Sequence, residues 1–96
     1  MHARVTTSRV PSAALDAAIQ SISSTALPQL REQGAKTMLL VNRETGEAMA
    51  ISFWEDEASM NASEERARAL RDEAAERSGA DVSGVTRYEV AVSDLG

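Results

Sequence analysis

The sequence predicts an α+β domain of the ferredoxin-like kind, with its elements in the order β-α-β-β-α-β. Three observations lead to this fold class: an alternating segment at the start, two strands joined by a tight turn in the middle, and a helical apolar stripe on either side of that pair. In this arrangement a four-stranded antiparallel sheet has two helices on one face. We expect residues 1–96 to form a single domain, because this length is typical of one hydrophobic core.

The N-terminal third predicts a strand followed by a long helix. Residues 2–9 alternate loosely and contain valine and threonine, which favour strands. A proline and Ser12 follow, and both suit a helix start, with Ser12 as the expected cap. From 13 to 33 the apolar residues recur every three or four positions, which indicates one buried helical stripe. Pro28 interrupts it, so the helix either kinks near Ser24 or ends there before a short second turn.

The middle of the chain predicts a β-hairpin. The strands are residues 36–41 and 47–54, and both of their faces are mostly apolar. The turn, Arg43–Gly46, ends in a glycine where a positive φ is expected. Strands that are apolar on both faces are usually covered on both faces. We therefore expect the helices to cover one face and a second copy of the sheet to cover the other, which makes a homodimer through the sheet face.

The C-terminal part predicts a second helix and a last strand. Asp56 is the expected helix cap and Gly79 its end. The buried stripe of this helix consists of Met60, Ala67, Leu70 and Ala74. Residues 85–92 alternate again and predict the fourth strand.

Composition and charge argue against several classes of protein. The net charge is −5 at pH 7, so phosphate backbones repel the chain and nucleic-acid binding is not expected. No apolar run approaches the ~20 residues needed to cross a bilayer, and the N-terminal segment lacks the apolar centre of a secretory signal. There is no cysteine for thiol chemistry, and a single histidine does not predict a metal site. We expect a cytoplasmic protein without a metal.

Several short motifs, spread over nearly the whole chain, resemble one family. They are Leu27-Pro28 late in the first helix, Thr45-Gly46 in the turn, Phe53-Trp54-Glu55 at the strand end, Glu57-Ala58-Ser59-Met60 at the helix start and Arg87-Tyr88-Glu89-Val90 near the end. Together they are similar to the antibiotic biosynthesis monooxygenase-like group of dimeric α/β barrels. The resemblance is more specific for fold than for activity, because these barrels host several chemistries.

The resemblance implies a cofactor-free oxygenase. In that group a polycyclic phenol or anthrone is deprotonated, and its anion reacts directly with oxygen, so no cofactor is expected. A second branch of similar fold degrades haem and uses an Asn on the first strand and a His on the second helix. The first strand here, HARVTTSRV, has no Asn, and the second helix has no His, which argues against haem degradation.

Five residues are candidates for a small aromatic ligand. Trp54 offers a flat surface for stacking, or it is simply a core residue. Arg4 and Thr6 share one face of the first strand; an inward Arg4 would hold a phenolate, and the alternative is an exposed strand face. Tyr88 would donate to a ligand oxygen or reach solvent, and Met38 adds either adaptable lining or plain packing. Of the five, Arg4, Trp54 and Tyr88 are the candidate catalytic residues.

Three functions are compatible with these features. The first is a cofactor-independent monooxygenase acting on a small aromatic substrate, although no strong general base stands out in the sequence. The second is a small-ligand-binding module with no turnover, and the third is a structural homodimer whose sheet face serves only assembly. A cavity with convergent polar groups favours the first two functions, and a filled interior favours the third.

Overall fold

The computed structural model describes residues 1–94, and their arrangement confirms the predicted β-α-β-β-α-β fold. The helical connections are subdivided into a 3₁₀ turn (η1), a π-helical turn (η2) and four α-helices. The elements are β1 (His2–Arg9), η1 (Ser12–Ala14), α1 (Leu15–Ser21), η2 (Ile22–Ala26), α2 (Leu27–Glu32), β2 (Lys36–Val41), β3 (Glu47–Trp54), α3 (Glu57–Ala62), α4 (Glu64–Ser78) and β4 (Asp81–Glu89).

The strands of the described residues form one antiparallel sheet in the order β2-β3-β1-β4. Because side chains alternate along a strand, the register assigns residues from all four strands to common rows on one face. On the face toward the helices these are a polar row (Thr37, Ser52, Arg4 and Arg87), a middle row (Leu39, Ala50, Thr6 and Val85) and a far row (Val41, Ala48, Ser8 and Val82).

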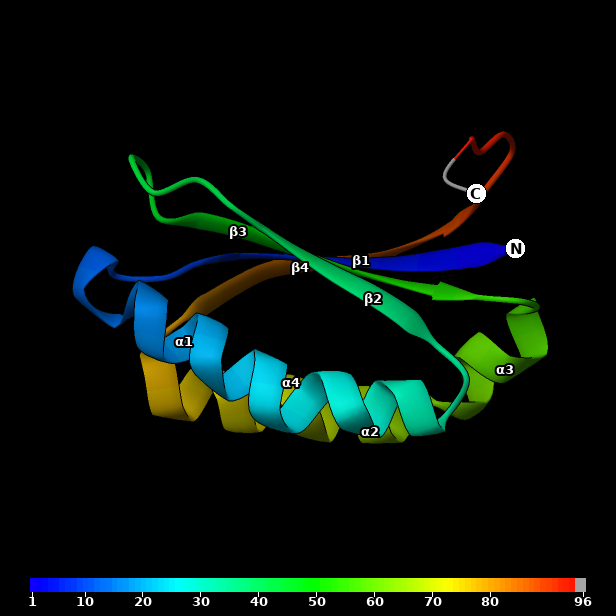
Figure 1. The fold of residues 1–96 in the computed structure, drawn as a ribbon, viewed down its shortest axis with the longest axis horizontal. Coiled ribbons are helices and arrows are strands. Elements are labelled where there is room, and N and C mark those ends of the chain that lie inside the picture. Colours follow the sequence, from blue (N-terminus) through cyan, green and yellow to red (C-terminus); the bar gives the residue numbers. More distant parts are fainter. Residues whose placement is uncertain (95–96) are drawn as a thin grey trace.

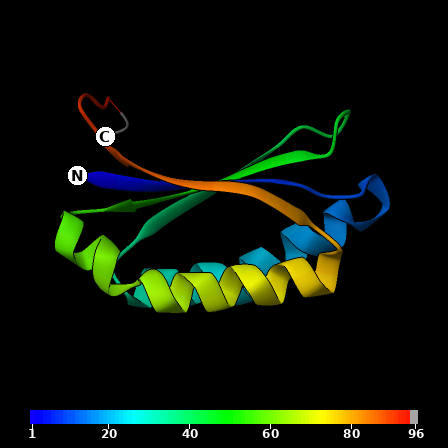
Figure 2. The same cartoon turned by 180° about the vertical axis from the view of Figure 1, so that it is seen from behind.

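The molecule has two layers, with the helices of the described chain on one face of the sheet (Figure 1). The continuous run α1–η2–α2 lies beside α4 in both views, and the two run in opposite directions (Figures 1 and 2). Nothing within residues 1–94 covers the opposite face of the sheet, called the outer face here. Its larger apolar side chains are exposed or half-buried: Val5, Met38, Leu40, Met49, Ile51, Phe53 and Tyr88.

The first helical segment continues across Pro28. The sequence leaves open a kinked helix or a helix that ends before a short second turn, and the structure is nearer to the kinked helix. The chain remains helical but widens into the π-helical turn η2 before α2 begins. The hydroxyl of Ser24 donates to the carbonyl of Gln20 at 2.8 Å within this irregular part. Such turns accommodate a local misfit in a helix without ending it. The predicted cap is wrong: Ser12 begins η1, and neither η1 nor α1 has a side-chain cap.

The second helical segment begins as predicted and is then interrupted. The Asp56 carboxylate accepts a hydrogen bond from the backbone N–H of Ser59 at 2.7 Å, which makes it the cap of α3. Ser63 separates α3 from α4, a break that the apolar stripe does not reveal. Gly79 ends α4 with φ at 70°, in the left-handed region that glycine adopts most easily.

Glycine decides the geometry of the hairpin. Gly46 has φ at 79°, and a Cβ at this position would lie 2.5 Å from the carbonyl oxygen of Val10. The Asn42 side chain accepts hydrogen bonds from the backbone N–H groups of Glu44 and Thr45, which closes the turn. Any larger residue at position 46 would therefore separate the turn from Val10.

The last strand differs from its predicted bounds. β4 begins at Asp81 instead of Val85 and ends at Glu89 instead of Val92. Its pairing with β1 shifts register next to Gly84, which lies opposite Thr7. Glycine inside a strand often marks such an irregularity, and the sequence pattern mistakes it for the boundary of the strand.

Candidate functional site

A cavity of about 580 Å³ lies between the sheet and the helices. Sites that hold drug-sized ligands span roughly 300–1,000 Å³. The cavity arises from small side chains, because alanine leaves empty the space that leucine or phenylalanine would fill. The lining alanines come from both layers: Ala14, Ala17, Ala18, Ala26, Ala48, Ala50, Ala67, Ala74, Ala75 and Ala80.

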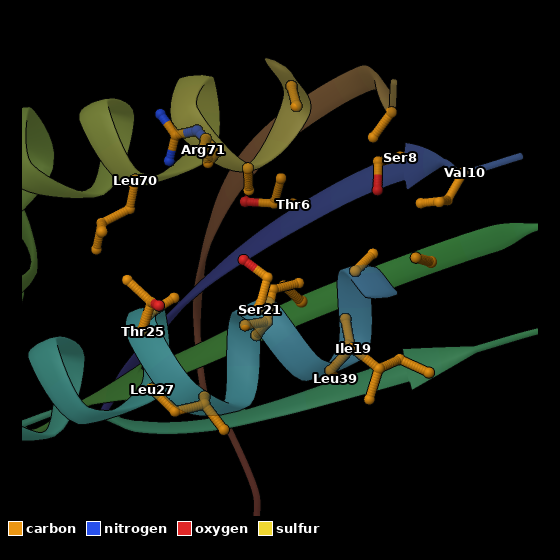
Figure 3. A pocket seen from close by; sticks show the side chains of 18 of the residues that line it. Thr6, Ser8, Val10, Ile19, Ser21, Thr25, Leu27, Leu39, Leu70 and Arg71 are labelled. Carbon is orange, nitrogen blue, oxygen red and sulfur yellow. The ribbon is translucent and has the colours of Figure 1, made fainter. Parts of the chain in front are cut away.

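Hydroxyl groups from both layers reach into this mostly apolar space. Thr6 on β1 and Ser21 on α1 line the cavity from opposite layers (Figure 3). Thr25 of η2 lines the same wall as Ser21, while Leu70 and Leu39 provide apolar surface from α4 and β2 (Figure 3). The lining therefore suits a mainly apolar molecule with a few oxygen atoms.

A closely packed core closes one end of the cavity, called the Trp54 end here. Trp54 and Met60 are each 1% exposed and pack with Ala35 and Leu30. The indole N–H of Trp54 donates to the Ser52 hydroxyl at 3.1 Å, so the polar atom of the ring has a partner although it is buried. A second cluster, around Val10 and Leu15, lies toward the other end of the sheet and is itself part of the lining.

Arg4 connects the sheet to the junction between α3 and α4. Its guanidinium donates to the carbonyl of Met60 at 2.7 Å and to the hydroxyl of Ser63 at 3.0 Å. It also lies 5.7 Å from the centre of the Trp54 ring, within the range of a cation–π interaction. Burial lowers the pKa of Arg4, an effect that the nearby Glu64 carboxylate opposes. An arginine nevertheless stays charged in proteins, so Arg4 is a permanent positive charge in the cavity wall.

Glu64 lies among three arginines at this end of the cavity. Its carboxylate is 3.0 Å from Arg4, 3.5 Å from Arg71 and 2.8 Å from Arg87. The hydrogen bond from Arg87 is the largest cause that lowers the pKa of Glu64; partial burial opposes it, and the positive charges of all three arginines add to it. Glu64 therefore stays ionised at neutral pH and does not have the raised pKa of a general base tuned for that range.

The structure brings together two of the five candidate ligand residues and separates the other three. Arg4 and Thr6 both line the cavity. Trp54 points to the same face of the sheet but lies beyond the lining, inside the packed core. Met38 and Tyr88 point to the outer face, where they are 38% and 54% exposed, because their register sets them opposite to Arg4 and Thr6.

The sequence pattern does not single out several residues that the structure places at the cavity. Arg71 of α4 lines it although its segment looks like a solvated helix face. Ser21 and Thr25 belong to a polar stretch that gives no motif, and Thr37 alternates within an ordinary strand. The signal that could have found the site is the number of alanines in the predicted core stripes, because facing alanines leave a space.

Two further features concern other kinds of site. Within residues 1–94, no three His, Cys, Asp or Glu side chains come together in a group that could hold a metal ion. Over the same residues, no helix is both long enough and apolar enough to span a membrane.

Comparison with known proteins supports the fold and leaves the activity open. No family model matches the chain. Uncharacterized proteins from two strains of Mycobacterium tuberculosis are 32% identical over 93 residues, which is 95% of this chain. The chain spans only 41% of the length of these curated relatives.

Solved structures with the same fold include antibiotic biosynthesis monooxygenases. A protein of Deinococcus radiodurans proposed to be such an enzyme superposes with a TM-score of 0.74 at 16% identity, with 100% of both chains covered. HapK from Hahella chejuensis gives 0.73 at 16% identity, with 100% of this chain and 98% of the other covered. A dimeric ferredoxin-like protein from an uncultured marine organism gives 0.65 at 10% identity, covering 99% and 97%. The chain thus has the fold of the monooxygenase structures, as its motifs suggest.

Proposed function

We propose that this domain binds a small aromatic molecule in the cavity between the sheet and the helices, and that it acts on this molecule as a cofactor-independent monooxygenase. The observation that supports the proposal most strongly is the cavity itself, with about 580 Å³ of space in a chain of 96 residues. A domain of this size normally needs all of its core for stability. A hollow core is therefore best explained by a ligand that fills it.

The chemistry of the lining supports an aromatic ligand. Alanine, leucine and valine surfaces favour an apolar body, and the hydroxyls of Thr6, Ser21 and Thr25 offer hydrogen bonds to oxygen substituents at its rim. Arg4 adds a fixed positive charge in the wall. A phenol or quinone matches this combination better than a purely aliphatic molecule does, because it has oxygen atoms on a rigid apolar frame.

The oxygenase part of the proposal is supported by the shared fold with the monooxygenase structures and by the chemistry of such substrates. The anion of an electron-rich phenol can itself give electrons to oxygen. One oxygen atom of O₂ then becomes a carbonyl at a ring carbon, and the other leaves as water with the hydrogen of that carbon and the hydrogen of the phenol hydroxyl. The domain would bind the anion beside Arg4 and keep water away from it.

The alternative is a binding module with no turnover. One observation favours it: within residues 1–94, neither a carboxylate nor an imidazole is among the residues that line the cavity. A substrate that must lose a proton would then have to lose it before it enters the cavity, or would have to transfer it to a water molecule. Binding is therefore the part of the proposal that the geometry supports directly, and turnover is the part that must be measured separately.

A homodimer through the outer face belongs to the same proposal. Met38, Leu40 and Met49 are exposed and adjacent on β2 and β3, and Tyr88 extends the patch across to β4. A contiguous apolar sheet face is typical of an interface. The fold neighbour named as dimeric supports a second copy of this chain as the occupant. Light scattering should give twice the chain mass for the wild type, and a Leu40→Glu variant should be a monomer.

The test of the function is a titration with aromatic phenols, quinones and haem, followed by the fluorescence of Trp54. Trp54 is the only tryptophan of the sequence, and its ring lies 5.7 Å from Arg4, which lines the cavity. We expect saturable quenching by one class of ligand after correction for inner-filter absorption. Any ligand that binds is then tested for oxygen consumption in an oxygen electrode.

An Ala50→Leu variant is the matched control. Ala50 lies in the middle row and lines the cavity, so leucine at this position occupies the proposed ligand space. Binding should fall at least ~10-fold in the variant while the circular dichroism spectrum stays unchanged. Equal binding in both proteins would contradict the cavity as the site, and binding without oxygen uptake would leave a binding module.

A further inference from the structure

The sheet wall of the cavity is most polar at one end. The polar row of the sheet forms this end, and the middle and far rows contribute mostly apolar side chains beyond it. On the helix side, Arg71 of α4 lines the cavity beside Leu70, and Figure 3 shows both side chains extending from α4. A ligand with a polar head and an apolar body therefore has one preferred direction in this space.

The positive charge at the polar end exceeds the negative charge. Among residues 1–94, Glu64 is the one carboxylate within ion-pair distance of Arg4, Arg71 and Arg87. One carboxylate therefore faces three guanidinium groups, and two positive charges are left without a partner of opposite sign. Arg77 also lines the cavity, but its guanidinium lies 2.5 Å from the carboxylate of Glu73. The excess is thus confined to the polar end.

Buried hydrogen-bonding atoms at this end lack partners within the described chain. The Nε atom of Arg4 and the hydroxyl oxygen of Thr37 are both buried and make no hydrogen bond. Both residues line the cavity. Ser52 stands between them in the polar row, and because its oxygen accepts from Trp54, its own O–H remains able to donate. Buried polar groups without partners are rare, and a bound ligand is one way to satisfy them.

We propose that the ligand of this cavity is an aromatic acid, whose carboxylate binds between Arg71 and Arg4 while its ring system extends toward Val10 and Leu15. The inference rests on the proposed function and specifies its ligand. A carboxylate supplies the negative charge that the three arginines lack, and a guanidinium holds it with two parallel hydrogen bonds. The hydroxyls of Ser52 and Thr37 are the neighbouring donors.

The test compares two probes of the same shape and different charge, anthraquinone-2-carboxylate and anthraquinone-2-carboxamide, by isothermal titration calorimetry. We expect the wild-type protein to bind the carboxylate roughly 10-fold more tightly than the carboxamide, as a charge-assisted hydrogen bond predicts. In Arg71→Gln this preference should fall close to unity. In Arg71→Lys a part of it should remain, because the charge is kept and the paired geometry is lost.

Arg77→Gln is the matched control, because Arg77 lines the cavity from the same helix but has its own carboxylate partner. It should keep the wild-type preference for the carboxylate. A preference that is absent in the wild type, or that survives Arg71→Gln unchanged, would overturn the acid as the ligand. If the carboxamide or a neutral quinone binds without this preference, the proposed function remains and the inference fails. If no aromatic ligand binds, both fail together.

Discussion

The Trp54 end and the alanine-lined middle of the same two-layer space differ in what fills them. At the Trp54 end, Trp54 and Met60 are almost fully buried and leave no room for a ligand. In the middle, Ala50 of the sheet and Ala74 of α4 belong to the lining of a cavity of about 580 Å³. Both regions lie between the same sheet and the same helices. Side-chain size therefore decides whether the space between these two layers is core or cavity.

The two regions should also contribute differently to stability. The packed end contains Trp54 and Met60, the largest fully buried side chains of the described residues, and the buried hydrogen bonds of Arg4. The middle gives up packing energy in exchange for a space that a ligand can occupy.

The first prediction compares truncations of similar size in the two regions. Met60→Ala, at the packed end, should lower the free energy of unfolding by about 2–5 kcal/mol, because it removes a side chain that is 1% exposed. Leu39→Ala, in the middle row, should cost only about 1–2 kcal/mol, because part of that side chain already faces empty space. Urea denaturation of both variants measures the difference, and equal costs would contradict the contrast.

The second prediction concerns the polar contacts that hold the packed end to the sheet. Arg4→Met removes the hydrogen bonds to Met60 and Ser63 and the ion pair with Glu64. The loss should be about 2–3 kcal/mol, since the buried acceptors lose a charged donor while the Met60 carbonyl keeps the Ser63 hydroxyl and Glu64 keeps two other arginines. The same denaturation series gives the value. A variant as stable as the wild type would show that these contacts are not needed for packing.

The third prediction concerns pH and is expected to be smaller. Because the folded-state pKa of Glu64 is lowered, its contribution to stability is present above the unfolded-state pKa of about 4.3 and is lost as pH falls through the lower folded-state value. Glu64→Gln should therefore have a weaker dependence of unfolding free energy on pH below about 5 than the wild type. Glu76→Gln, which neutralises an exposed carboxylate on the same helix, is the control for loss of one charge. Identical slopes for the wild type and Glu64→Gln would contradict the role of the arginine cluster.

The smallest effect is a gain. Ala50→Leu fills part of the cavity, and the extra buried apolar surface should raise the free energy of unfolding by about 1 kcal/mol. The same substitution should weaken ligand binding at least ~10-fold, so stability and binding change in opposite directions. Thermal denaturation measures the gain. A variant that is clearly less stable would mean that the middle region is already packed to capacity.

The sequence predicts the fold better than it predicts the site, for physical reasons that particular residues illustrate. Alternation, the turn glycine at position 46 and the Asp56 cap are local signals, and the structure contains all three features. The break at Ser63 is different, because it accompanies long-range contacts: the Ser63 hydroxyl accepts from Arg4 and donates to the carbonyl of Met60. Such contacts leave no periodic pattern in the chain.

The site depends on which residues face one another across two layers. The pattern correctly places Arg4 and Thr6 on one face of β1, but it cannot show that alanines oppose them and leave a cavity. Trp54 lies on the same face and looks like a ligand platform in the sequence, yet it is two positions beyond Ser52, where the packed core begins. Its position along the strand, and not its residue type, decides whether it can contact a ligand.

The most direct test of a ligand-binding interior is an NMR measurement of nuclear Overhauser effects between a bound aromatic ligand and the methyl groups of the protein. We expect contacts from the ligand to Ala50, Leu39 and Leu70, which line the cavity, and none to the methyl group of Met60 in the packed end. Contacts to Met38 and Leu40 instead would place the ligand on the outer face. That result would contradict the central claim that the alanine-lined middle of the molecule is its binding site.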